Sequence, residues 1–343
     1  MAYTTIKKPS DYFNTKLYTG NGGTQSITGV GFQPDWVWCK TRNDTQDHQI
    51  IDAVRGVTKT LATNGQAAEF TDSNGLTAFG TDGFTLGSSG GINGSGDTLV
   101  SWNWKAGTTG SGTTTGSGTG KAYSYSVNTT SGFSIVKYVG NGTGGHTIPH
   151  HLGVTPSNVI IKNVSATQSW MCKMKGYDGY LYMETTDAGT ANSTWLPTDS
   201  TNLTLANNWS AYNSNDATYI AYSFAEKTGY SKFGSFLVNS NSTNFVYTGF
   251  KPKFIIMKQY SSTSGNAQWG IFDDKRDGYN SKSNFLYANT SGAEDSSNAQ
   301  TLDFLSNGFK LRGEYVSAKA GQSNIFMAFA DQPLIGDNPA TAR

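Results

Sequence analysis

Charged residues, cysteine and long apolar runs are all scarce in this sequence. Lys, Arg, Asp and Glu make up 14 % of its 343 residues, against roughly a quarter in typical globular domains, and the net charge is +1. No stretch concentrates Lys or Arg, so we expect no binding to nucleic acid through phosphate neutralisation. No apolar run of about 18 residues occurs, and residues 1–10 lack the apolar core of a signal peptide, so we expect neither membrane insertion nor secretion.

The only two cysteines are Cys39 and Cys172. They lie at non-equivalent places in two repeated segments, so one segment cannot form an internal disulfide. We therefore expect two buried thiols in a chain that folds in a reducing cytoplasm.

Uncharged polar residues and aromatic residues are plentiful instead. The chain contains 41 glycines and 13 % aromatic residues, and Ser, Thr and Asn are abundant. The aromatic and β-branched residues supply enough apolar area to offset chain entropy, so the chain is not expected to be disordered. This composition is typical of many-stranded β-sandwiches with long turns.

One short pattern occurs three times: a proline, an apolar or aromatic run, and a lysine six residues after the proline. The copies begin at Pro34, Pro156 and Pro252, about one hundred residues apart, and such repetition predicts related structural modules. In the first copy, Trp36 and Trp38 alternate with Val37, as expected for a strand of a sandwich.

Strand signals dominate the rest of the chain. We predict an all-β fold of three tandem antiparallel β-sandwich modules, jelly-roll or lectin-like, over residues 1–107, 123–230 and 231–343. Residues 108–122 are rich in Gly, Thr and Ser and are expected to form a flexible linker. The linker would isolate the first module, a possible anchor to a particle, while the other two modules would form one body.

The first and third modules share an Asp, an Arg three residues later, and a Glu further along the chain. The pattern predicts a structural ion-pair cluster that pins a loop. The alternative is a pair of carboxylates that acts on a sugar, but a neighbouring Arg holds carboxylates ionised, so we predict no catalytic residues. The two sets are Asp52, Arg55 and Glu69, and Asp273, Arg276 and Glu294.

His146, His150 and His151 form the only histidine cluster. Two imidazoles can begin a metal site, but no Cys, Asp or Glu lies within ten residues of them, so we predict no metal. The glycine-rich stretches lack the lysine-serine ending of a phosphate-binding loop, so we predict no cofactor.

Trp195, Trp209 and Tyr212 lie in polar, loop-like stretches of the middle module. Aromatic rings can stack on the apolar faces of sugars, so these residues are the predicted glycan or receptor site. The alternative is that they belong to a hydrophobic core.

Several strings of this chain are distinctive in combination, including residues 32–42, 52–56, 82–87, 102–107 and 224–234. They resemble a repeat module of unknown function in virion proteins of marine tailed bacteriophages, including those of cyanobacteria. The resemblance implies a location in the phage particle and no catalytic residues.

These observations favour a virion structural protein, assembled in the host cytoplasm, over an enzyme. The leading hypothesis is a homotrimeric tail fibre or adhesin that contacts other virion proteins and a host surface glycan or receptor, mainly through loops of the middle module. The alternative is a capsid decoration or knob protein. A remote alternative is a glycan depolymerase that would use Asp52 with Glu69, or Asp273 with Glu294.

Overall fold

The computed structural model describes residues 3–261, 267–296, 302–314, 318–335 and 339–340. Within these ranges the chain forms 28 strands, one short helix, α1 (Gly90–Asn93), and one 3₁₀ turn, η1 (Pro9–Asp11). All pairings between these strands are antiparallel, from the first pair, β1 with β9, onward. The all-β prediction is therefore confirmed. No helix of the described residues is long and apolar enough to cross a membrane.

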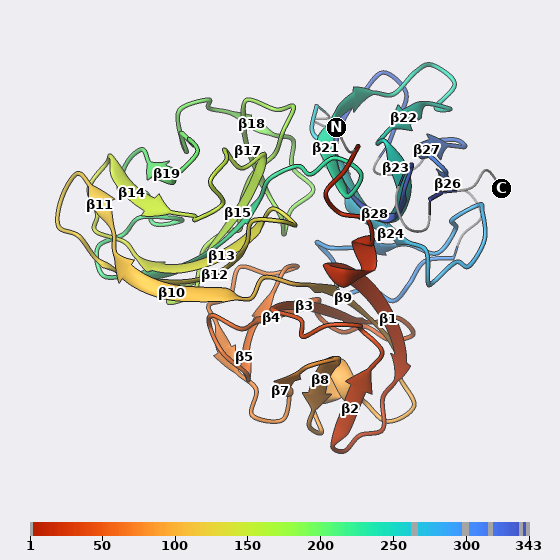
Figure 1. Ribbon diagram of the computed structural model, residues 1–343, viewed down its shortest axis with the longest axis horizontal. Helices are drawn as coiled ribbons and strands as arrows, with labels where there is room; N and C mark the ends of the chain where they lie inside the picture. The colour runs from red at the N-terminus through yellow and green to blue at the C-terminus, as the bar shows by residue number, and fades with distance from the viewer. Residues whose placement is uncertain (1–2, 262–266, 297–301, 315–317, 336–338, 341–343) are drawn as a thin grey trace.

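The strands form six sheets, which fall into three sets along the chain and occupy three lobes (Figure 1). The first lobe, residues 13–104, pairs a six-stranded with a three-stranded sheet. In sheet order, the strands are β1 (Phe13–Thr19), β9 (Thr98–Trp104), β3 (Trp36–Thr41), β4 (Gln49–Asp52), β5 (Lys59–Ala62) and β6 (Phe70–Thr71), then β2 (Gln25–Thr28), β8 (Gly83–Leu86) and β7 (Leu76–Gly80).

The second lobe, residues 108–224, pairs an eight-stranded with a three-stranded sheet. Its large sheet has the order β10 (Thr108–Thr113), β12 (Ala122–Asn128), β13 (Phe133–Val139), β20 (Thr218–Phe224), β15 (Asn158–Asn163), β16 (Met171–Lys173), β17 (Gly179–Tyr182) and β18 (Thr190–Ala191). Its small sheet has the order β11 (Thr115–Gly116), β14 (His146–Pro149) and β19 (Asn202–Leu205).

The third lobe, residues 231–333, pairs a five-stranded with a three-stranded sheet. The large sheet contains β21 (Ser231–Leu237), β28 (Ser323–Pro333), β23 (Phe250–Gln259), β24 (Trp269–Asp273) and β25 (Leu286–Tyr287), and the small one contains β22 (Phe245–Tyr247), β27 (Gly308–Leu311) and β26 (Leu302–Leu305).

The three large sheets share one strand order. The order β1-β9-β3-β4-β5 of the first lobe corresponds to β13-β20-β15-β16-β17 in the second and β21-β28-β23-β24-β25 in the third. Each repeated proline-to-lysine segment overlaps the middle strand of this order, which is β3, β15 or β23. The sequence repeat thus corresponds to a repeat of topology. The division into three independent modules stays a prediction, because a shared strand order does not show that each lobe folds alone.

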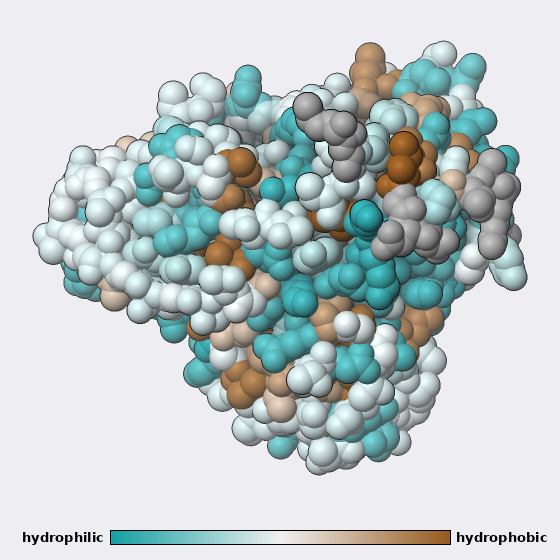
Figure 2. Space-filling model, in the orientation of Figure 1, coloured by the Kyte–Doolittle hydropathy of each residue, from teal (hydrophilic) through white to brown (hydrophobic). Residues whose placement is uncertain are grey.

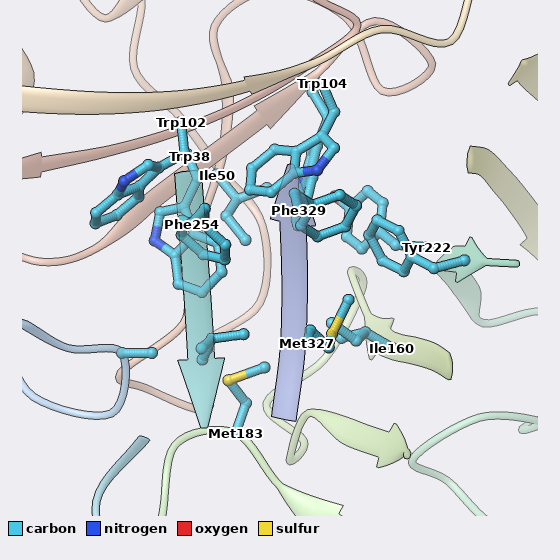
Figure 3. Packing of buried hydrophobic residues seen from close by; sticks show 14 of the residues in the cluster. Trp38, Ile50, Trp102, Trp104, Ile160, Met183, Tyr222, Phe254, Met327 and Phe329 are labelled. Carbon is cyan, nitrogen blue, oxygen red and sulfur yellow. The ribbon is translucent and has the colours of Figure 1, made fainter. Parts of the chain in front are cut away.

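That common core lies where the three large sheets face one another (Figure 3). Three aromatic contacts illustrate it, with ring centroids 4.9 Å apart for Trp36 and Tyr222, 5.5 Å for Trp104 and Phe254, and 6.0 Å for Phe224 and Phe329. The expectation that the first module stands apart is therefore wrong. Apolar side chains from all three lobes also enclose a central cavity of about 10 Å³, which is too small to hold a ligand.

The middle strands of the large sheets are buried on both faces. In β3, Trp36 and Trp38 point into the common core, whereas Val37 and Cys39 pack against the small sheet of the first lobe. The predicted alternation of this strand is confirmed, and all six of its residues are buried. Cys39 and Cys172 are buried free thiols, as predicted.

Residues 108–122 do not form a free linker. Strand β10 pairs with β12 from Thr108 opposite Val127 to Thr113 opposite Ala122. The linker prediction was wrong because glycine usually weakens strands, whereas the glycines of β10 leave room for aromatic rings on the paired strand. A Cβ atom on Gly110 would lie 2.6 Å from the Tyr125 hydroxyl.

Candidate functional site

Equivalent backbone hydrogen bonds join each lobe to the next. In each case an amide that follows the β5, β17 or β25 strand donates to the carbonyl two residues after a repeat lysine. The bonds run from Glu69 to Val164 (3.0 Å), from Gly189 to Tyr260 (2.9 Å) and from Glu294 to Arg42 (2.7 Å). They link the first lobe to the second, the second to the third and the third to the first, so the three lobes form a closed ring.

Indole groups form a second set of bonds between lobes. Trp170 Nε1 donates to the Ala62 carbonyl, and Trp269 Nε1 donates to the Tyr182 carbonyl, both over 2.9 Å. The corresponding place in the first lobe is occupied by His48, whose pKa is lowered by burial.

The repeat lysines are buried at these junctions. Lys162 Nζ donates to the carbonyl of Gln66 in the first lobe, and Lys258 Nζ donates to the carbonyl of Thr185 in the second, each over 3.0 Å. Burial lowers the pKa of Lys40 and Lys162 to about 8 and that of Lys258 to about 7. The sequence showed these lysines only as strand ends and did not indicate that they connect lobes.

The ion pairs predicted in the first lobe are present. Arg55 Nε lies 2.5 Å from Asp52 Oδ2, and Arg55 Nη1 lies 3.2 Å from Glu69 Oε2. The Tyr222 hydroxyl of the second lobe donates to Asp52 Oδ2 over 2.8 Å. The cluster therefore also joins two lobes.

The third lobe repeats this arrangement. Arg276 Nε lies 2.6 Å from Asp273 Oδ2, and its Nη1 lies 3.1 Å from Glu294 Oε2. From the first lobe, Trp102 Nε1 donates to Asp273 over 3.0 Å, and Arg42 forms a bidentate pair with Glu294. In the second lobe Met174, an apolar residue buried in the common core, takes the place of the aspartate.

These carboxylates are poorly placed for acid–base chemistry. In each cluster one arginine lies between the two carboxylates, whereas a glycosidase needs a carboxylic acid with a raised pKa. Burial opposes ionisation of Asp273, but Arg276 lowers its pKa below the ordinary value. The geometry of these clusters is that of a buried polar contact that holds two lobes together.

Two of the three predicted glycan-binding aromatics are inaccessible. Trp195 is 2 % exposed and Tyr212 is fully buried, and both lie in the core between the sheets of the second lobe. Trp195 Nε1 donates to the Gly179 carbonyl over 3.0 Å. Trp209 is half-buried and packs edge-on against Tyr212. The prediction was wrong for Trp195 and Tyr212. Although polar residues surround them in the sequence, their rings fold back into the core between the two sheets of the second lobe.

The histidine cluster is also internal. His146 and His150 are buried, and His146 Nδ1 lies 2.8 Å from Asn141 Nδ2. His151 stacks on Tyr125 with ring centroids 3.7 Å apart. Over the described ranges, no three His, Cys, Asp or Glu side chains converge as a metal site would require.

A cleft of about 490 Å³ lies on the third lobe, and the sequence did not indicate it. It lies over the loop that follows β24. The side chains that line it include Lys251, Asp274, Lys275, Tyr279, Lys282 and Phe304. This cleft is the candidate binding site.

Comparison with known families gives a match over most of the chain. Residues 8–333 match a family described as a domain of unknown function, DUF7483. A search of curated proteins found no match. Because the matched residues span most of the sequence, the chain belongs to the DUF7483 family.

Proposed function

We propose that this protein is a structural component of a bacteriophage particle, of the tail-fibre or adhesin type. The main supporting observation is the closed ring of three lobes, which buried polar groups join into one body. The resemblance of the repeated strings to phage virion proteins is consistent with this role. An all-β body that presents loops around its periphery suits attachment to a surface.

In this proposal the partners are other virion proteins and a glycan or receptor on the host surface. The three lobes already close a ring within one chain, so a threefold-like scaffold does not depend on association of chains. A homotrimer of chains remains a prediction, which the mass of the purified protein in solution tests.

Localisation on purified phage tests the proposal. Antibodies raised against the protein should label particles at the tail, and the free protein should reduce adsorption of phage to host cells. Absence of the protein from purified particles would overturn the proposal.

The ring also favours a second candidate, a capsid decoration or knob protein. A chain with three similar lobes can occupy a threefold position of a shell. Quantitative mass spectrometry of particles distinguishes the candidates, because decoration requires many more copies than a fibre does. A glycan depolymerase has less support, because Asp52, Glu69, Asp273 and Glu294 all contact arginine.

A further inference from the structure

The cleft on the third lobe is built on an insertion. Leu61 and Leu286 occupy equivalent positions, because they pair with Ile50 and Ile271 in matching registers. The preceding arginine lies six residues before Leu61 in the first lobe but ten residues before Leu286 in the third. The loop of the third lobe is therefore longer than that of the first, and Tyr279 lies within this longer loop.

Polar contacts hold the inserted loop in place. The Asp277 carboxylate accepts hydrogen bonds from the amides of Ser283 (2.7 Å) and Asn284 (2.6 Å). The Asn280 side chain exchanges two hydrogen bonds with the backbone of Phe304, of 2.8 and 2.9 Å. The cleft is therefore preformed, which lowers the entropic cost of binding.

The lining favours an anion. Lys251, Lys275 and Lys282 line the cleft with a single carboxylate, that of Asp274. The Lys275 side chain is 49 % exposed and its Nζ lies 4.0 Å from Asp274 Oδ2, too far for a hydrogen bond. Lys251 lies 3.4 Å from Asp331.

Cationic side chains continue beyond the cleft. Lys275 also lines a second hollow with Lys16. Lys253 lines a third with Lys7, Lys8 and one carboxylate, that of Asp331, which lies 3.4 Å from Lys253. Figure 2 shows hydrophilic residues gathered over η1 and the adjoining part of the third lobe. An extended ligand with repeated negative charges would fit this surface.

An aromatic ring stands beside these cations. Tyr279 is 83 % exposed, and such a ring can pack on the apolar face of a sugar. The volume of about 490 Å³ lies within the usual range for small-ligand sites. Lysines beside an exposed tyrosine match a sugar that bears a carboxylate better than a neutral sugar or a simple anion.

We propose that this cleft binds an acidic saccharide, with its carboxylate on Lys275 and Lys251 and a sugar ring on Tyr279. This inference rests on the proposed attachment function and moves the receptor site from the second lobe to the third.

Calorimetric titration with oligogalacturonate, a neutral galactose oligosaccharide and inorganic phosphate tests the inference. We expect binding of the acidic saccharide alone. Lys275→Ala should weaken binding about tenfold or more, as loss of a charged hydrogen bond implies, and Tyr279→Ala should also weaken it. Asp274→Asn should strengthen it by removing a repulsive charge.

The matched control is Lys59→Ala, because Lys59 is a lysine of similar exposure, 41 %, on the first lobe. It should leave affinity unchanged, and thermal unfolding should show that every variant is folded. Absence of acidic-saccharide binding, equal binding of the neutral saccharide, or an unchanged affinity in Lys275→Ala would overturn the inference. Phosphate binding that survives in Tyr279→Ala without saccharide binding would show a simple anion site instead.

The two proposals can fail separately. A protein that labels phage particles but binds no acidic saccharide contradicts only the saccharide site. A protein that binds the saccharide but is absent from particles contradicts only the virion role.

Discussion

At the residue scale, buried polar groups connect the lobes. Trp170, Trp269, Lys162 and Lys258 all donate to backbone carbonyls of a neighbouring lobe. A buried acceptor that loses its donor retains its desolvation cost, so each of these side chains matters more than an exposed polar group would.

Replacement of Trp269 by Phe should show this effect. The change removes the donor to the Tyr182 carbonyl and should lower the free energy of unfolding by about 1–3 kcal/mol. Urea denaturation measures the change. Trp209→Phe is the control, because Trp209 packs within one lobe, and equal stability losses in the two variants would contradict the role of the indole bond.

Lys258 should make stability depend on pH. Burial lowers its pKa from 10.5 to about 7, although Asp187, Cys172 and Glu184 act in the opposite direction. Between these values the unfolded chain binds a proton that the folded chain lacks. The contribution of Lys258 to the free energy of unfolding should therefore rise as the pH increases from about 7 towards 10.

The variant Lys258→Met separates this effect from that of other groups. Urea denaturation across this pH window should give a shallower rise for the variant than for the original chain. Lys40 and Lys162, whose pKa values are lowered to about 8, contribute in the same direction in both proteins. Cys39, whose pKa is raised by burial to about 12, contributes in the opposite direction in both. Identical slopes in both proteins would rule out this role of Lys258.

At the element scale, β10 shows how a low-complexity segment can be part of a sheet. Its backbone supplies the hydrogen bonds, and its glycines leave space for the rings of Tyr123 and Tyr125 on the paired strand. Glycine at such a site is favoured by close packing and not by flexibility.

Gly110→Val should therefore destabilise the protein. The new Cβ would lie 2.6–2.8 Å from atoms of the Tyr125 ring and hydroxyl, and such overpacking costs about 1–3 kcal/mol. Thermal denaturation measures the loss. Ser111→Val, at an exposed neighbouring position of β10, should be neutral or slightly stabilising. A stabilised Gly110→Val variant would indicate a free segment.

At the scale of the whole molecule, the three lobes share one core. Each large sheet buries its second face only against the other lobes, so an isolated lobe would expose large aromatic residues such as Trp36 and Trp104. Loss of one lobe should therefore destabilise the others.

We expect one cooperative unfolding transition. Differential scanning calorimetry of the full chain should give one peak whose calorimetric and van't Hoff enthalpies agree. A fragment of residues 1–107 should aggregate or lack a cooperative transition. Two or more separate transitions, or a stable folded fragment, would support independent modules.

The local chemistry of this chain is readable from its sequence. Alternation in residues 36–40 predicted a strand, because strand side chains point to opposite faces with a period of two. The spacing of Asp52 and Arg55 predicted an ion pair, because the two residues lie three apart and meet within one turn of chain. The scarcity of helical patterns predicted the all-β class.

Only the tertiary structure decided which surfaces meet. Trp195 is buried and Tyr279 is exposed, although polar residues surround both in the sequence. The pairing of β10, the ring of lobes and the cleft all depend on residues far apart in the chain. The sequence determined which segments form strands and which residues repeat. Long-range packing decided which repeated residues connect neighbouring lobes and which loop lines a cleft, because both depend on contacts between distant parts of the chain.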